Sequence, residues 1–417
     1  MKRLSLLKSS LTLLTALGSI TLTFLPSISE TPRDPNNRFN RDYSPSISEP
    51  VSEPISTPGV KPQNPSSEEL GKQLVQELSQ CMRNAIPSSE PESLAALQMA
   101  SMQCTVRVII LTPDGKVRTD ASERMNAILT AMNVTLPATV SQGQASVKLE
   151  IIPDSMVYTV PVVVGGKAQR FLLDTGASNS ILSEPIVKQL GLTGTTLPSD
   201  ILAYFVVGDD CSNINATLHS LPEIAVDAAT VEGMNGMGLP KTAIPGDLAG
   251  VLGLDFLKSF DVLINPKDST LQLLPRSNVV AGGVPLKGKM GVMTTEVFVN
   301  GKGPYTFLLD TGADVMVLSN RLANTLSIDV EKAENTEVKG FCGNEIGKKV
   351  SLSSVKLQNY ESSNLDGVVL NNELLDLLGV DGIVGQNYLN QYQQHWRFGE
   401  PNSLGFPEAG SLTLKPL

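Results

Sequence analysis

From about residue 150 to the C-terminus, short apolar runs alternate with Gly, Asn and Pro residues. Runs of this length, separated by turn residues, predict β-strands. Two of the runs reach a dipeptide that readily takes positive φ, Gly165-Gly166 in one case and Asn300-Gly301 in the other. Each dipeptide predicts a tight β-hairpin. We therefore expect this part of the chain to be turn-linked β structure.

Residues 66–140 follow a different pattern, and we expect a small helical or α/β accessory region there. Ser66 and Glu69 form a capping box for a first helix. The apolar positions of this helix repeat at helical spacing: Leu70, Leu74, Leu78 and Cys81. A strand is predicted at Val106–Thr112, and a second helix begins at Asp120. One face of the second helix carries Met125, Ile128, Leu129 and Met132.

The N-terminal residues 1–29 read as a targeting segment. Lys2 and Arg3 precede an apolar run from Leu11 to Leu25, and Pro26 ends it. This run suits a signal peptide, and an uncleaved N-terminal anchor is the alternative. Both interpretations place the mature chain outside the cytoplasm, as a secreted or periplasmic protein whose membrane contact is limited to the anchor. Residues 30–65 are rich in Pro and Ser and predict a disordered linker.

An internal repeat divides the β region into two lobes. FLLDTGASNSILSEPIVKQLGL at 171–192 matches FLLDTGADVMVLSNRLANTLSI at 307–328 without gaps, at an offset of 136 residues. A second shared block, LAGVLGLDFLKSF at 248–260, matches VDGIVGQNYLNQY at 380–392. The repeat predicts an all-β fold with two pseudo-symmetric lobes, lobe 1 at 150–278 and lobe 2 at 279–417.

Composition limits the chemistry that these lobes can perform. The net charge is −10, so the basic surplus of a dedicated nucleic-acid binder is absent. The sequence has only 2 His, His219 and His395, which lie in different repeats and make a histidine-rich zinc site barely possible. Any acid–base chemistry is therefore expected to use carboxylates.

The repeat places the motif Asp-Thr-Gly directly after an apolar strand in both lobes, at 174–176 and 310–312. On these motifs and the paired Gly blocks, the sequence resembles the retropepsin-like aspartic proteases over roughly residues 150–417. The resemblance implies an aspartic endopeptidase whose Asp174 and Asp310 form a dyad between the lobes. The dyad would activate water to hydrolyse a polypeptide substrate, and no metal or cofactor would be required.

The resemblance also implies roles for the neighbours of the two aspartates. Thr175 and Thr311 would hydrogen-bond across the pseudo-twofold axis, while Gly176 and Gly312 would let backbone approach the carboxylates. A flap should cover the cleft a few tens of residues after each Asp, although ordinary β-turn structure explains the same segments. The flap candidates are Tyr204 and Gly208 in lobe 1 and Gly340 and Phe341 in lobe 2.

Four cysteines in an exported chain permit two disulfides. Cys81 and Cys104 fall in one N-terminal region, and their pairing is the favoured interpretation, with free buried thiols as the alternative. Cys211 and Cys342 occupy similar places in the two repeats.

Both aspartates lie in one chain, which favours a monomer with the site between its own lobes. Pairing of lobes between two chains is an alternative. A non-catalytic peptide-binding envelope protein on the same fold is the second functional hypothesis, and binding without cleavage would distinguish it.

Overall fold

A computed structural model describes residues 25–26, 66–85, 100, 103–114, 118, 120–131, 139–197, 214–277, 282–372, 375, 378–402 and 405–417. Most of the predicted targeting segment and the predicted 30–65 linker lie outside these residues. Tyr204, Gly208 and Cys211 lie outside them as well. Within the described part of the chain, no helix is long and apolar enough to cross a membrane.

The N-terminal region is helical, as predicted, but it lacks the expected strand. It contains α2 (Ser67–Ala85), η1 (Val106–Ile110) and α4 (Ala121–Ala131). The capping box is present, since the N–H of Ser66 donates to Glu69 Oε2 at 3.0 Å and the N–H of Glu69 donates to Ser66 Oγ at 3.3 Å. The strand predicted at Val106–Thr112 is wrong: the segment forms the π-helix η1.

The disulfide between Cys81 and Cys104 is confirmed, and it joins α2 to the turn that precedes η1. Leu74 and Leu78 of α2 are fully buried, and so is Ile128 of α4. The side chain of Leu129 and all of Met132 lie outside the described residues. The apolar faces of α2, η1 and α4 therefore pack on one another, and their buried residues form one cluster with buried residues of both lobes.

Lobe 1 consists of short strands and helices. Its strands are β2 (Val140–Gln142), β3 (Ala145–Lys148), β4 (Glu150–Ile151), β5 (Tyr158–Val164), β6 (Lys167–Leu173), β7 (Ile181–Ser183), β8 (Thr195–Leu197), β9 (Ala216–Ser220), β10 (Ile224–Val226), β11 (Ala229–Glu232), β12 (Asn235–Leu239), β13 (Gly250–Leu252), β14 (Phe260–Asn265) and β15 (Thr270–Pro275). Its helices are α5 (Glu184–Gln189), η3 (Lys241–Ala243), η4 (Pro245–Asp247) and α7 (Leu254–Leu257).

Lobe 2 repeats this plan with longer strands. Its strands are β16 (Val284–Lys289), β17 (Val292–Val299), β18 (Lys302–Leu309), β19 (Met316–Ser319), β20 (Asn335–Gly340), β21 (Gly343–Leu357), β22 (Tyr360–Leu370), β23 (Gly382–Val384), β24 (Tyr392–Phe398) and β25 (Ala409–Pro416). Its helices are α8 (Asn320–Leu326), η5 (Val330–Lys332) and α10 (Gln386–Leu389).

The two lobes share one strand topology. In lobe 1, β13 lies between β6, which is parallel to it, and β7, which is antiparallel. In lobe 2, β23 lies in the same way between β18 and β19. Both predicted hairpins form, with φ of 58° and 75° at Gly165 and Gly166 and 51° and 73° at Asn300 and Gly301. The predicted fold of two pseudo-symmetric β lobes behind a small helical region is confirmed.

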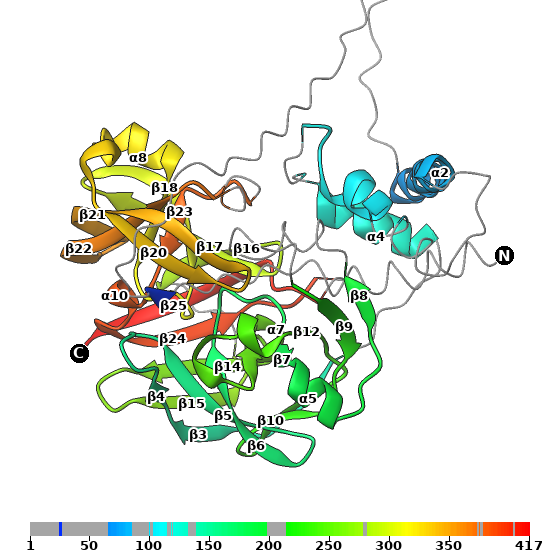
Figure 1. Cartoon of the computed structure of the whole chain (residues 1–417), viewed down its shortest axis with the longest axis horizontal. Helices are drawn as coiled ribbons and strands as arrows, with labels where there is room; N and C mark the ends of the chain where they lie inside the picture. Colours follow the sequence, from blue (N-terminus) through cyan, green and yellow to red (C-terminus); the bar gives the residue numbers. More distant parts are fainter. Residues whose placement is uncertain are drawn as a thin grey trace, which may run out of the picture.

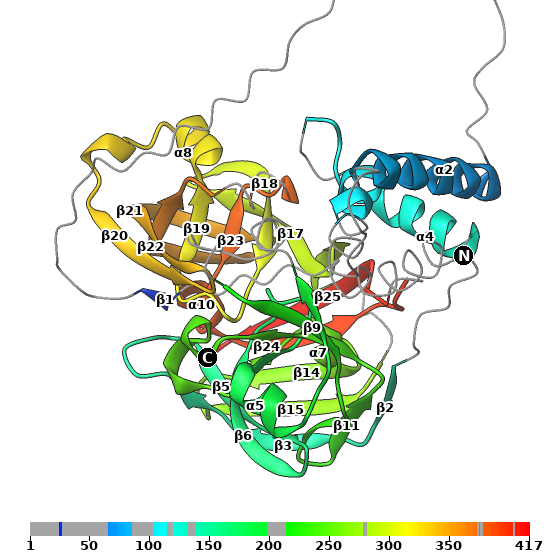
Figure 2. The same ribbon diagram turned by 45° about the vertical axis from the view of Figure 1, so that its right-hand side comes forward.

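The strands form two sheets among the described residues, one of 11 strands in lobe 1 and one of 14 strands. The larger sheet crosses from lobe 2 into lobe 1, because β3, β15, β14, β24, β25 and β16 follow one another in it. Figures 1 and 2 show β24 and β25 beside β14 of lobe 1, between β14 and the rest of lobe 2. Backbone pairing between β14 and β24 therefore ties the lobes together.

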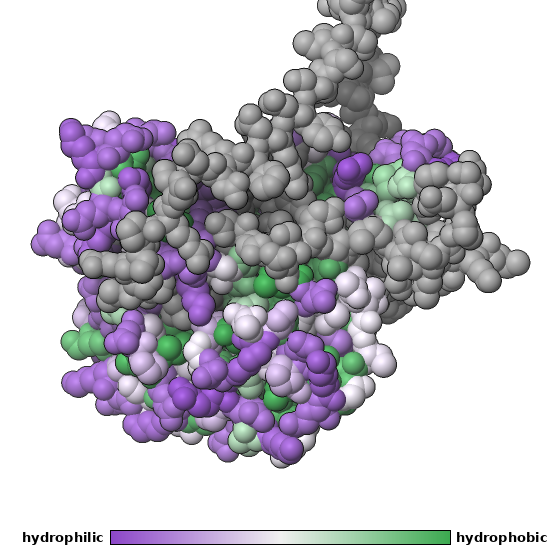
Figure 3. All heavy atoms as spheres, in the orientation of Figure 1, coloured by the Kyte–Doolittle hydropathy of each residue, from purple (hydrophilic) through white to green (hydrophobic). Residues whose placement is uncertain are grey.

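The single tryptophan, Trp396, marks the centre of this shared layer. It lies opposite Val262 of β14 and Leu412 of β25, and all three side chains are fully buried. Hydrophilic residues cover most of the described surface of the lobes on the face drawn in Figure 3. The apolar residues are thus concentrated inside the lobes and in the layer that joins them.

We predict that Leu412→Ala destabilises the protein by about 2–5 kcal/mol, because it leaves a cavity beside Trp396. Urea unfolding followed by Trp396 fluorescence measures this change. Lys415→Ala on the same strand is the control, since Lys415 is exposed. Equal effects of the two substitutions would contradict a buried interlobe layer.

Candidate active site

Asp174 and Asp310 follow directly after β6 and β18, the two strands that pair with the central Gly-block strands β13 and β23. The N–H of Asp174 donates to Leu252 O, and the N–H of Asp310 donates to Val384 O, each at 3.1 Å. Both aspartates are therefore fixed at the end of a strand by the block that the sequence repeat identified.

Each Gly block also supports the loop that follows its aspartate. The N–H of Leu254 donates to Ala177 O at 2.6 Å, and the N–H of Gln386 donates to Ala313 O at 2.7 Å. At Gly385, an added Cβ would lie 2.7 Å from the carbonyl carbon of Val315, so only glycine fits under this loop. The blocks hold the two Asp-Thr-Gly loops in matching conformations.

The two threonines link the loops across the lobe boundary. The N–H of Thr175 donates to Thr311 Oγ1 at 3.0 Å, and the N–H of Thr311 donates to Thr175 Oγ1 at 3.1 Å. Each hydroxyl in turn donates to a carbonyl of the opposite lobe, that of Leu309 at 3.1 Å and that of Leu173 at 2.9 Å. Four buried hydrogen bonds thus join the loops, in the arrangement that the resemblance implied.

The carboxyl groups of Asp174 and Asp310 face each other at the centre of this network, and both residues are fully buried. A Cβ added to Gly176 would lie 2.5 Å from Asp310 Oδ2, and one added to Gly312 would lie 2.7 Å from Asp174 Oδ2. Each glycine therefore borders the carboxylate of the other lobe, where a side chain would displace it. The structure brings the two predicted aspartates together.

Burial, followed by the charge of Asp174 and a hydrogen bond with it, raises the pKa of Asp310 well above its ordinary value. The backbone surroundings differ between the two carboxylates. Asp174 Oδ1 accepts the N–H groups of Gly176 at 2.8 Å and Ala177 at 2.9 Å, whereas Asp310 Oδ1 accepts that of Gly312 at 2.7 Å. Because the N–H groups of Gly312 and Gly176 both oppose the rise in the pKa of Asp310, that rise comes from burial and from the neighbouring Asp174.

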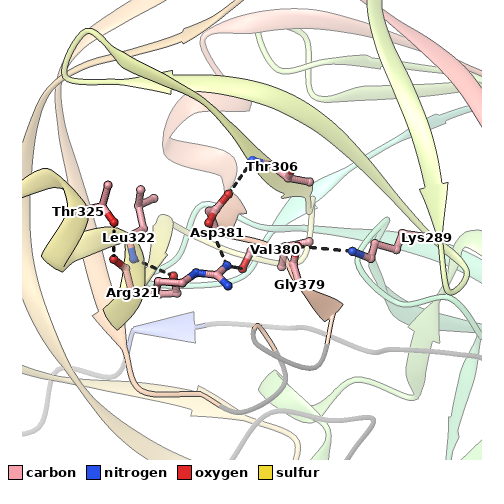
Figure 4. Close-up of polar contacts among 9 residues, drawn as sticks. Lys289, Thr306, Arg321, Leu322, Thr325, Gly379, Val380 and Asp381 are labelled. Atoms are coloured by element: carbon pink, nitrogen blue, oxygen red, sulfur yellow. Dashed lines mark hydrogen bonds and ion pairs between the residues drawn. The ribbon is translucent and has the colours of Figure 1, made fainter. Parts of the chain in front are cut away.

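The loop that leads into β23 is held by a carboxylate that lobe 1 lacks. Asp381 accepts the N–H of Thr306 at 2.9 Å and pairs with Arg321 at 3.0 Å, while Lys289 reaches Gly379 O at 3.4 Å (Figure 4). The corresponding residue of lobe 1 is Ala249. Lobe 2 therefore anchors its half of the site through side-chain charges.

The lobe 2 flap candidates Gly340 and Phe341 lie at the end of the hairpin formed by β20 and β21. Phe341 is buried, with 1% of its surface exposed. The other edge of β20 pairs with β1 (Leu25–Pro26), so that Leu25 lies opposite Lys339. This edge accepts an extended segment of the chain. The lobe 1 candidates Tyr204 and Gly208 lie outside the described residues.

Sequence reasoning missed Gln386, a buried side chain whose Nε2 donates to Thr311 O at 2.9 Å. The repeat aligns Gln386 with the apolar Leu254. A polar residue in one repeat where the other is apolar was the sequence signal that could have identified Gln386. Among the residues that the structure describes, no cluster of three His, Cys, Asp or Glu could hold a metal ion.

Comparisons with known proteins found the following similarities. The family model described as "gag-polyprotein putative aspartyl protease" matches the chain twice, over residues 160–259 and 295–391. A crystal structure of a retropepsin-like aspartic protease from Rickettsia conorii is similar at 20% identity, covering 34% of this chain and 97% of that chain, with a TM-score of 0.24. No curated protein matches the sequence. Each family match spans one lobe and includes one of the two aspartates.

We predict that Thr175→Val destabilises the protein by about 1–3 kcal/mol, because it leaves the buried N–H of Thr311 without an acceptor. Thr175→Ser retains the hydroxyl and is expected to stay close to the wild type. The free energy of unfolding in urea measures both. A Thr175→Val protein as stable as Thr175→Ser would show that these hydrogen bonds do not join the lobes.

Proposed function

Because this chain is a retropepsin-like protein of two lobes, we propose that it is an aspartic endopeptidase whose dyad is Asp174 and Asp310. The observation that carries the proposal is the pair of buried carboxyl groups, one from each lobe, held face to face by reciprocal threonine hydrogen bonds. Two carboxyl groups this close do not both ionise readily, so the pair retains one proton at pH values where an ordinary aspartate is already ionised.

The raised pKa of Asp310 supports a division of roles between the two aspartates. Asp174, with two N–H donors on one oxygen, is the ionised member and accepts a proton from the attacking water. Asp310, whose pKa is raised, donates its proton to the carbonyl oxygen of the scissile peptide. The water oxygen then bonds to the carbonyl carbon to give a tetrahedral diol. Asp174 passes the proton that it took from water to the nitrogen, Asp310 takes back a hydroxyl proton, and the C–N bond breaks. Titration belongs to the pair rather than to either residue.

The proposed substrate is an extended polypeptide. The pairing of β20 with Leu25–Pro26 supports this, because that strand edge already binds main chain in the antiparallel manner. Both aspartates are fully buried, so a substrate reaches them only after the segments that cover them have moved.

We also propose that the protein acts outside the cytoplasm as a monomer. The disulfide between Cys81 and Cys104 supports an oxidising compartment. The hydrogen bonds between Thr175 and Thr311 support a monomer, since they complete the site within one chain.

We predict that Asp174→Asn and Asp310→Asn each lower kcat on an unfolded protein substrate by at least about a hundredfold, because each removes one proton-transfer group. Mass spectrometry of the product fragments at successive times measures the rate of cleavage. Glu408→Gln, at an exposed position, is the control. Cleavage by either dyad variant at the rate of the control would exclude the mechanism.

We predict that kcat/KM falls as the pH rises through the upper pKa of the dyad. The raised pKa means that Asp310 is protonated below that value and loses its catalytic proton above it. A pH series on a single peptide substrate measures the profile. Activity that increases steadily across the alkaline range would contradict a shared-proton dyad.

The complete burial of both aspartates favours a second candidate, a peptide-binding protein that does not cleave its ligand. Such a protein would bind an extended peptide with equal affinity in the wild type and in the Asp310→Asn variant. Intact peptide recovered after long incubation at acidic and neutral pH would support this candidate over the endopeptidase.

A further inference from the structure

The turn between β4 and β5 belongs to lobe 1 but is bound by side chains of lobe 2. The N–H of Met156 donates to Asp314 Oδ1, and Asn390 Nδ2 donates to Met156 O at 2.9 Å. The turn is closed on itself, since the N–H of Ile152 donates to Val157 O at 3.1 Å. Both polar backbone atoms of one residue in lobe 1 are therefore held by lobe 2.

Asp314 connects this contact to the dyad. It lies four residues after Asp310 in the same loop, and its own backbone carbonyl accepts the N–H of Asn387 at 2.8 Å. Only 1% of Asp314 is exposed, and its buried Oδ2 has no hydrogen-bond partner among the residues that the structure describes. A change in how Asp314 binds Met156 therefore acts on the loop that carries Asp310.

Lobe 1 holds the equivalent turn of lobe 2 without a carboxylate. Ser178 stands where lobe 2 has Asp314, and Lys258 stands where lobe 2 has Asn390. Ser178 packs on Gly291 in that turn, where an added Cβ would lie 2.6 Å from Ser178 Cβ, whereas Lys258 Nζ donates outside the turn, to Gly405 O at 2.5 Å. At these pseudo-symmetric positions, lobe 1 therefore has a lysine and no carboxylate, whereas lobe 2 has a carboxylate and no lysine.

We propose that Asp314 and Asn390 form a latch on the backbone of Met156 that holds the two lobes together, and that Asp314 is a positioning residue that closes this latch on acidification. The latch is independent of the proposed endopeptidase function. Its effect on hydrolysis rests on that function.

The direction of the pH effect follows from burial. Burial raises the pKa of Asp314 from 3.8 to about 7, and the N–H groups of Met156 and Val157 oppose this shift. Between about pH 4 and 7 the latched protein holds a proton that an exposed Asp314 would release. Lowering the pH within this window therefore stabilises the latched protein. Above about pH 7, Asp314 no longer makes the stability depend on pH.

The other titratable groups around the latch are few in the described structure. Asp154 lies on the bound turn and is exposed, and Asp310 lies on the loop of Asp314. Helix α10 contributes amide side chains and Tyr388, whose hydroxyl donates to Tyr360 O at 2.8 Å and so faces away from the latch. Asp154 and Asp310 are therefore the neighbouring carboxyl groups that the experiment must distinguish from Asp314.

The test is urea unfolding of the full chain between pH 5 and 9 for the wild type, Asp314→Asn and the control Asp154→Asn. Between pH 5 and 7 the unfolding constant of the wild type should rise with pH more steeply than that of Asp314→Asn, by up to tenfold per pH unit. The slopes should coincide above pH 8, and Asp154→Asn should follow the wild type. Equal slopes for wild type and Asp314→Asn would overturn the proposal.

A titration of the wild type keeps the proposal falsifiable if Asp314→Asn does not fold. The carboxyl carbon of Asp314, followed by NMR, should titrate near pH 7, and a midpoint near 4 would overturn the latch. The kcat/KM profile separates the two proposals. Hydrolysis whose pH dependence is the same in the wild type and Asp314→Asn refutes the positioning role of Asp314, whereas a latch without hydrolysis refutes the endopeptidase alone.

Discussion

The reciprocal hydrogen bonds between Thr175 and Thr311 are the interaction on which the rest of the structure depends. They hold the two Asp-Thr-Gly loops, one from each lobe, next to each other. The carboxyl groups of Asp174 and Asp310 therefore face each other in a buried site. Burial and mutual repulsion then raise the pKa of one carboxyl group. The chemistry is thus a consequence of how firmly the two lobes are joined.

Contacts outside the site also hold the two lobes together. Pairing of β14 with β24 carries one sheet across both lobes, with Trp396 buried at its centre. The lobes then use different side chains at equivalent positions, such as Asp381 where lobe 1 has Ala249. A fused chain permits this divergence, because each lobe contacts one defined partner and the two halves of the boundary need not be identical.

The repeat made the fold and the aspartates predictable, because both depend on local signals. The hairpins at residues 165–166 and 300–301 need dipeptides that take positive φ, and the capping box needs two residues three apart. The strand predicted at Val106–Thr112 failed because a short apolar run fits a strand and a buried helix equally well. The contact of Met156 with Asp314 spans 158 residues and involves a backbone N–H, so no pattern in the sequence indicates it.

The central claim is that the two buried carboxyl groups share one proton. The most direct measurement is a pH titration of the carboxyl carbons of Asp174 and Asp310 by NMR in the intact protein. The account predicts two separate steps, with the pair retaining a single proton well above the pH at which an ordinary aspartate ionises. Titration of both groups together near the ordinary value of 3.8 would contradict it.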